Sequence, residues 1–127
     1  MFEYITDAPN APKAIGPYSQ AVIAGDIIYL SGQVPLDPKT GQIEVTDIAA
    51  QAKQVMLNIQ SVLSACKLSF KNVVKSTIFL TDLKNFQTVN EVYEAHLGGV
   101  KPARSTVQVS ALPKGAQIEI EVIAIRT

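Results

Sequence analysis

Arg104 and Glu119 are the two residues of this 127-residue chain whose types and spacing could do chemistry together. They lie on two β-forming runs, Ala103 to Val109 and Gln117 to Ile125, which a Leu-Pro-Lys-Gly turn separates. Side chains alternate between the faces of a strand, so two strands sharing one core would present Arg104 and Glu119 on the same side. A fixed cation beside a carboxylate could hold a small acid. The commoner alternative is a cross-strand ion pair worth about 0.2–1 kcal/mol.

The face assigned to this pair has a composition that favours a site over a surface ion pair. It would also carry Thr106 and Gln108 from the first strand, and Ile123 and Ile125 from the second. That mixture is too apolar for a solvated face and too polar for a core.

Three further positions could line such a site, and each has a structural alternative. Tyr18 follows Gly16-Pro17, a rigid turn that would aim its side chain, although many tyrosines are half-buried packing residues. Ser31-Gly32 ends a strand, where glycine lets a ligand approach the backbone and serine supplies a hydroxyl; a simple bulge is the alternative. Asn90 lies on a helix, where a local hydrogen bond is the alternative.

The catalytic groups that most enzymes use are scarce in this sequence. His96 is the only histidine and Cys66 the only cysteine, so neither a Ser-His nor a Cys-His constellation can form. Cys66 lies on an apolar helical stripe and is expected to be a core thiol, and His96 is expected to be structural or merely exposed. No Walker loop, dinucleotide fingerprint, metal motif or nucleophile elbow appears. We therefore expect neither a metal nor a cofactor.

Composition narrows the class of protein. Eleven basic and eleven acidic residues give zero formal charge without any charged block, which disfavours nucleic-acid binding. The sequence has no apolar run of about 20 residues and no signal-peptide pattern, so we expect a cytoplasmic protein without a membrane partner. Only 17% of the residues are charged while 47% are hydrophobic, which favours an oligomer whose subunits cover one another.

The hydrophobic pattern predicts one α+β domain over residues 1–127. A short strand near the start, a hairpin at Gly25-Asp26, a helix from Asp47 to about Lys67 and a strand from Val73 to Thr81 precede a second helix ending at Gly98-Gly99. Together with the last two strands they predict a mixed sheet of about six strands with two helices on one face. The other, semi-apolar face, carrying Thr77, Phe79, Thr106, Gln108, Glu119 and Ile123, should be buried against another copy.

Five segments resemble the Rid/YjgF family in order and spacing over nearly the whole chain. They are Ile15-Gly16-Pro17-Tyr18-Ser19-Gln20, Ser31-Gly32-Gln33-Val34-Pro35, Val89-Asn90-x-x-Tyr93, Pro102-Ala103-Arg104-Ser105 and Ile118-Glu119-Ile120-Glu121. The resemblance implies a chorismate-mutase-like homotrimer with ligand clefts between subunits. It also implies hydrolysis of reactive 2-imino acids and enamines, such as 2-iminobutanoate and 2-iminopropanoate, to 2-keto acids and ammonia.

The resemblance also assigns roles to individual residues. Arg104 would bind the substrate carboxylate and Glu119 would orient the attacking water. Tyr18, Ser31, Gly32, Asn90 and Thr106 would line the cleft. Two departures from the family pattern are Thr106, where many members have cysteine, and the short connection 98–101, which could alter access to the cleft.

Two other functions remain open at this point. A ligand-sensing or chaperone-like interaction protein would use the same cleft without turnover. An endoribonuclease or translation inhibitor would want an acid–base pair and a basic groove, and the sequence shows neither. The preferred imine, the pathway and any regulatory partner are not specified by the sequence.

Overall fold

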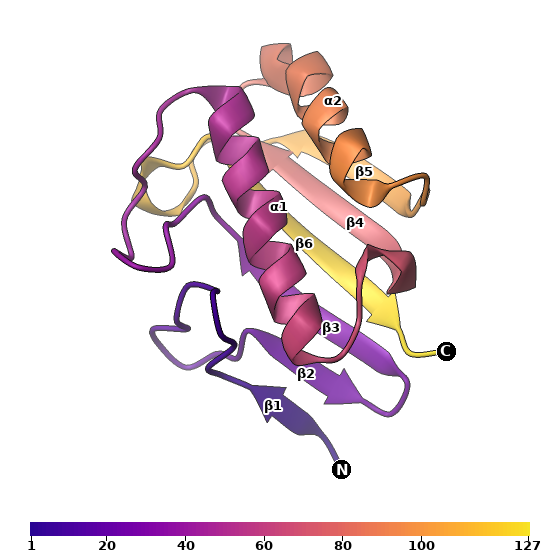
Figure 1. Ribbon diagram of the computed structural model, residues 1–127. Helices are drawn as coiled ribbons and strands as arrows, with labels where there is room; N and C mark the ends of the chain where they lie inside the picture. Colours follow the sequence, from indigo (N-terminus) through magenta and orange to yellow (C-terminus); the bar gives the residue numbers. More distant parts are fainter.

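The fold is a single α+β domain, described by a computed structural model over residues 1–127 (Figure 1). Six strands form one sheet, and two α-helices with three short 3-10 helices connect them. In chain order the elements are β1 (Glu3–Ile5), β2 (Ala21–Ala24), β3 (Ile27–Gln33), α1 (Ile48–Ala65), η1 (Phe70–Asn72), β4 (Val73–Leu80), η2 (Leu83–Asn85), α2 (Phe86–Leu97), β5 (Ala103–Gln108), η3 (Pro113–Gly115) and β6 (Ile118–Ile125). The predicted fold class, with six strands and two helices, is confirmed.

The strands follow the order β1-β2-β3-β6-β4-β5 across the sheet. All neighbours are antiparallel except β4 and β5, which run parallel, so the sheet is mixed as predicted. The two strands that carry Arg104 and Glu119 are not neighbours, because β4 lies between β5 and β6. The expectation of a direct cross-strand pair was therefore wrong: the Leu112–Gly115 turn leads the chain over β4 rather than back onto β5.

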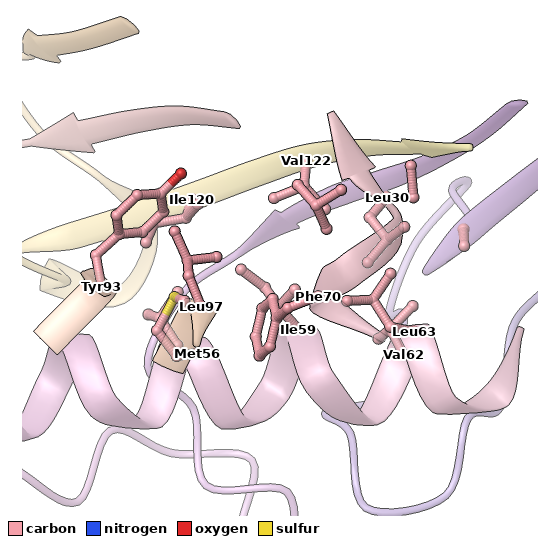
Figure 2. Packing of buried hydrophobic residues seen from close by; sticks show 14 of the residues in the cluster. Leu30, Met56, Ile59, Val62, Leu63, Phe70, Tyr93, Leu97, Ile120 and Val122 are labelled. Carbon is pink, nitrogen blue, oxygen red and sulfur yellow. The ribbon is translucent and has the colours of Figure 1, made fainter. Parts of the chain in front are cut away.

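Both helices pack on the same face of the sheet, and the hydrophobic core lies between the two layers (Figure 1). Helix α1 turns one stripe toward the strands: Figure 2 shows Met56 beside Leu97 of α2, and Leu63 further along α1 below Leu30 of the sheet. Burial of each such side chain contributes about 1.5–3 kcal/mol to folding.

The predicted helix boundaries are accurate to within a few residues. The Asp47 carboxylate caps α1 by accepting a hydrogen bond from the backbone N–H of Ala50 at 3.0 Å. Helix α2 ends at Gly98 in the left-handed conformation with φ of 61°, as the Gly-Gly stop predicts. At the start of α2, the Asp82 side chain caps the preceding η2, and Asn85 at the N-cap of α2 makes no side-chain hydrogen bond.

The register shows which face each candidate side chain occupies. Arg104 pairs with Ser76, which is buried beneath the helices, whereas Glu119 pairs with Phe79 on the opposite face. The expectation that Arg104 and Glu119 share a face was wrong, and so was the placement of Thr106 and Gln108 on the open face. The physical reason is that β5 is an edge strand whose apolar Val107 turns away from the helices, so its polar set lies on the helix side.

The face without helices remains semi-apolar and partly exposed in the single chain. Across it, the strand register places in succession Tyr4, Val22, Tyr29, Ile123 and Lys75. Tyr29 keeps 47% and Val107 42% of their surface exposed. A contiguous exposed face with this much aromatic and aliphatic surface is typical of a protein–protein interface.

Neither helix combines the length and the hydropathy that crossing a lipid bilayer requires.

Candidate functional site

The predicted site residues fall into two separate hollows, which we name after their principal residues. The Glu119 cleft has a volume of about 820 Å³ and contains Tyr18, Ser31 and Gly32 beside Glu119. The Arg104 pocket has a volume of about 640 Å³ and contains Asn90 beside Arg104. Thr106 lines neither of them.

An irregular segment of β3 holds the backbone of Ser31 and Gly32 against Glu119. The regular pairing of β3 with β6 breaks between Leu30 and Gln33, which is the bulge that the glycine indicated. A Cβ atom added at Gly32 would overlap the Glu119 carboxylate. The absence of a side chain at this position is therefore what allows the carboxylate to lie against the strand.

The N-terminal loop completes the wall of the Glu119 cleft, and buried hydrogen bonds fix this loop. Gln20 is buried; its Oε1 accepts from the backbone N–H of Ala8 at 2.7 Å, and its Nε2 donates to the carbonyl of Pro12 at 2.6 Å. The Ser31 hydroxyl donates to the carbonyl of Ser19 at 2.6 Å. Tyr18 follows from this anchored segment and keeps 52% of its surface exposed at the cleft.

Glu119 is half-buried, and its surroundings favour the protonated carboxyl. Burial raises the pKa of Glu119 above the ordinary glutamate value, and the neighbouring Glu121 carboxylate raises this pKa further. A carboxyl group with a raised pKa in a cleft can exchange a proton with water or substrate more readily than an ordinary surface glutamate.

In the Arg104 pocket, residues of α2 hold the guanidinium group. Arg104 Nη1 donates to Asn90 Oδ1 at 2.6 Å, and the guanidinium carbon lies 5.4 Å from the Phe86 ring centroid and 5.3 Å from that of Tyr93. The Tyr93 hydroxyl in turn donates to Ser76 Oγ at 2.8 Å. The guanidinium is held by these contacts while most of its five N–H donors remain available for a planar anion.

Arg104 and Glu119 cannot act on one small molecule within a single chain. The register places them two strands and three residues apart, which is about 10 Å across the strands and about 10 Å along them. Because they also lie on opposite faces of the sheet, the two groups are in separate environments. Each hollow holds one half of the predicted site.

Sequence reasoning missed several residues of these two hollows. Phe86 and Tyr93 were not named as site residues, yet their spacing around Asn90 is helical and indicates one shared face. Lys13, Lys39 and Lys114 also line the Glu119 cleft, and no local sequence pattern indicates that they meet.

The remaining reactive side chains lie outside both hollows. His96 Nδ1 lies 2.9 Å from the carbonyl oxygen of Val92, one turn earlier on α2, in agreement with a structural role. Cys66 is buried at the end of α1, and burial raises the pKa of its thiol, as expected for an unreactive core cysteine. No group of three or more His, Cys, Asp or Glu side chains gathers in a metal-binding arrangement. The unpartnered side-chain oxygen of Thr106 is buried.

Comparison with known proteins identifies relatives over almost the whole chain. Residues 8–126 match a family model described as Endoribonuclease L-PSP. The chain is 57% identical over 118 residues to protein DfrA of Myxococcus xanthus, covering 91% of this chain and 90% of that protein. It is 47% identical over 126 residues to the human 2-iminobutanoate/2-iminopropanoate deaminase, covering 99% and 92%.

Solved structures with the same fold cover the chain from end to end. The YjgF gene product of E. coli superposes with a TM-score of 0.92 at 46% identity, covering 98% of this chain and 100% of that one. TdcF of E. coli, crystallised with bound serine, superposes with a TM-score of 0.91 at 42% identity and the same coverage.

Proposed function

The chain belongs to the Rid/YjgF family, and we propose that it is a hydrolytic deaminase of reactive 2-imino acids such as 2-iminobutanoate and 2-iminopropanoate. The products would be the corresponding 2-keto acid and ammonia. The observation that carries the proposal is the pair of half-sites, a guanidinium held for carboxylate binding and a glutamate with a raised pKa. Mammalian relatives about 47% identical to this chain are named for this activity.

We infer that the complete site forms between two copies of the chain, in a homotrimer. One protomer supplies the Arg104 pocket and the next supplies the Glu119 cleft. The semi-apolar open face around Tyr29 and Val107 supplies the contact surface. This arrangement brings the Arg104 guanidinium to Glu119, whose pKa is raised within its own chain by burial and by the Glu121 carboxylate.

The chemistry of an imine matches this small set of groups. Arg104 holds the substrate carboxylate through parallel N–H donors, which fixes C2 in place. A water molecule attacks C2 of the protonated imine while Glu119 accepts one of the water protons, so that the former imine nitrogen becomes an amine on a tetrahedral carbon. Return of the proton from Glu119 to that nitrogen allows the C–N bond to break, and the new hydroxyl loses its proton as the keto group forms. Water orientation and proton transfer together provide about 10²–10⁴-fold acceleration.

Tyr18, Ser31, Gly32, Asn90 and Thr106 have supporting roles in this proposal. Asn90 orients the guanidinium, and Gly32 leaves room for the Glu119 carboxylate. Tyr18 and the Ser31 segment form the wall next to the substrate. Thr106 lies on β5 close in sequence to Arg104, and its hydroxyl would replace the cysteine of many relatives.

The test is a coupled assay in which a threonine dehydratase generates 2-iminobutanoate while semicarbazide competes for it. We expect the purified protein to accelerate 2-oxobutanoate and ammonia formation. Arg104→Ala should abolish the acceleration, whereas Glu119→Gln should reduce turnover more than 2-oxobutanoate binding. Lys84→Ala, a surface substitution outside both hollows, is the control. Binding of 2-oxobutanoate without any acceleration would instead support a ligand-sensing protein.

An endoribonuclease activity, which the family model's description names, receives no support from the site. The only histidine is bonded within its own helix, and the chain carries no net positive charge. Incubation of the purified protein with labelled single-stranded RNA, with Glu119→Gln as the matched variant, gives the direct comparison. Cleavage lost in this variant would contradict the deaminase assignment as the main activity of the cleft.

A further inference from the structure

Three lysines lie in the Glu119 cleft, and the proposed reaction does not use them. Lys13 comes from the N-terminal loop, Lys39 from the turn after β3 and Lys114 from η3. Three segments that are far apart in the sequence therefore each bring one cation to the same hollow. Glu119 is the only acidic residue that lines the cleft, so the formal charge of the cleft is positive.

The backbone at Lys114 is also unusual. Its φ is 57°, in the left-handed region that non-glycine residues seldom adopt. The Lys114 ammonium group lies 3.5 Å from the carbonyl oxygen of Gly41, so η3 and the turn carrying Lys39 meet at this wall. A strained backbone that positions a charged side chain at a cleft is a feature typical of binding sites.

None of the three lysines is a cause of the shifted pKa of Glu119. The pKa of Glu119 is raised by burial and by Glu121, and no lysine opposes this rise. Direct pairing with an ammonium group would lower the pKa of a carboxyl.

The cleft is also larger than a small imino acid needs. A volume of about 820 Å³ lies in the range that accommodates drug-sized ligands. Even with one end occupied by a second protomer, the part of the cleft around the lysines is not needed by the methyl or ethyl group of 2-iminopropanoate or 2-iminobutanoate.

From the three lysines and the size of the cleft, we propose that Lys13, Lys39 and Lys114 form a subsite for a second anionic group, so that the protein prefers 2-imino acids with an anionic side chain. This inference rests on the proposed function. The 2-carboxylate would bind Arg104, and the distal carboxylate or phosphate would bind the lysines. The hydrolysis itself is unchanged: water adds to C2 and ammonia leaves.

The test compares two imines of nearly equal shape, formed by an L-amino-acid oxidase from glutamate and from glutamine. They differ in a side-chain carboxylate against a carboxamide. We expect kcat/KM for the glutamate-derived imine to be about tenfold higher, as three weak exposed ion pairs would give. This preference should shrink as NaCl is raised, because salt screens exposed charges. Inorganic phosphate should compete with the glutamate-derived imine if the subsite accepts phosphate groups; a lack of competition restricts it to carboxylates.

The matched variants are Lys13→Gln/Lys39→Gln/Lys114→Asn and, as a charge control, Lys53→Gln/Lys71→Gln/Lys84→Gln, whose lysines lie outside the cleft. Asparagine is chosen at position 114 because it tolerates the left-handed conformation. The cleft variant should lose the preference and retain its rate with the glutamine-derived imine, while the control variant should keep both. An equal rate for the two imines in the wild type, or a preference unchanged in the cleft variant, would overturn the subsite.

A binding measurement separates this inference from the proposed function. Isothermal titration with 2-oxoglutarate and with its 5-methyl ester, whose side chain is uncharged, requires no turnover. Tighter binding of 2-oxoglutarate that disappears in the cleft variant supports the subsite even if no imine is hydrolysed. Equal binding of the two keto acids contradicts the subsite even if the deaminase assay succeeds.

Discussion

At the residue scale, Glu119 depends on the missing side chain of Gly32. The carboxylate lies where a β-carbon at position 32 would be. The backbone of Gly32 does not require glycine's conformational freedom, because its φ is outside the left-handed region. The constraint at this position is therefore the space next to Glu119, which a substitution can test directly.

Gly32→Ala should displace the Glu119 carboxylate and lower deaminase activity at least tenfold. The steric overlap should also destabilise the fold by about 1–3 kcal/mol, as overpacking typically does. In a Glu119→Ala background the same substitution should cost much less, because the overlapping group is gone. Urea unfolding of the four proteins in this double-mutant cycle gives the coupling energy, and additive costs would contradict the close approach.

The raised pKa of Glu119 predicts the direction of a pH effect. The proposed base is the carboxylate form, so kcat/KM should fall as pH drops through a pKa above the ordinary glutamate value. Glu121→Gln removes the neighbouring negative charge that raises this pKa, and should shift the acidic limb to lower pH. A pH–rate profile of both proteins from pH 4 to 8 tests this shift. A limb that stays in place or moves upward would show that Glu119 is not the titrating group.

The same shift makes a prediction for stability. A carboxyl whose folded-state pKa is raised binds its proton more tightly in the folded chain, so its contribution favours folding at low pH and is lost as pH rises through the folded pKa. Glu119→Gln cannot ionise and should therefore unfold at a higher temperature than the wild type at pH 8. The difference should become smaller at pH 4. Thermal melts of both proteins at the two pH values provide the comparison. A wild type that melts at a higher temperature than Glu119→Gln at pH 8 would contradict the raised pKa.

At the scale of elements, α1 supports the Glu119 cleft through one buried amide. Asn58 is fully buried, and its Nδ2 donates to the carbonyls of Val34 at 3.2 Å and Leu36 at 2.9 Å. Val34 and Leu36 line the cleft, so this helix residue ties α1 to a segment of the cleft wall that lies outside the strands.

Asn58→Leu keeps a similar shape and should leave the Leu36 carbonyl without its donor, while the Val34 carbonyl keeps only the backbone N–H of Leu36. Buried unsatisfied polar groups cost about 1–3 kcal/mol, and the cleft wall should become mobile. We expect both a lower unfolding midpoint and a raised KM for the imine. Ser61→Ala, which removes only a bond to the Leu57 carbonyl in the same helix, is the control and should change stability by less than about 0.5 kcal/mol.

At the scale of the whole molecule, the separation of Arg104 from Glu119 is the main constraint on function. A protomer holds one of each, on opposite faces of its sheet, so any joint action requires two protomers. The exposed open face around Tyr29 and Val107 provides the surface through which copies could associate.

Mixing Arg104→Ala with Glu119→Ala subunits should restore activity that neither inactive variant has alone. Heteromers refolded from an equal mixture contain some interfaces where both residues are intact. Complementation that fails in a mixture shown to be heteromeric would contradict a shared site.

Tyr29→Arg should weaken assembly, measured by light scattering after size-exclusion chromatography, and reduce activity in parallel.

Much of the fold followed from local patterns. The 3.6-residue stripe from Ile48 to Cys66 and the alternation from Val73 to Leu80 determined a helix and a strand, because side-chain burial on one face requires those periods. The helix stop at Gly98-Gly99 and a cap at Thr46 or Asp47 were also predicted, since each meets a local backbone requirement, and the structure identifies Asp47 as the cap. The residue types of the site, the Arg104 guanidinium and the Glu119 carboxylate without a histidine partner, were likewise predicted from the sequence.

Only the tertiary structure decided which residues meet. The order of strands placed β4 between β5 and β6, and the parallel pairing of an edge strand turned Arg104 toward α2. Strand order and the facing of an edge strand depend on contacts across the whole sheet, which no local period specifies. The same is true of Lys13, Lys39 and Lys114, which three separate loops bring to one cleft. The sequence by itself therefore determined the residue types of the site, whereas long-range packing determined their division between two hollows.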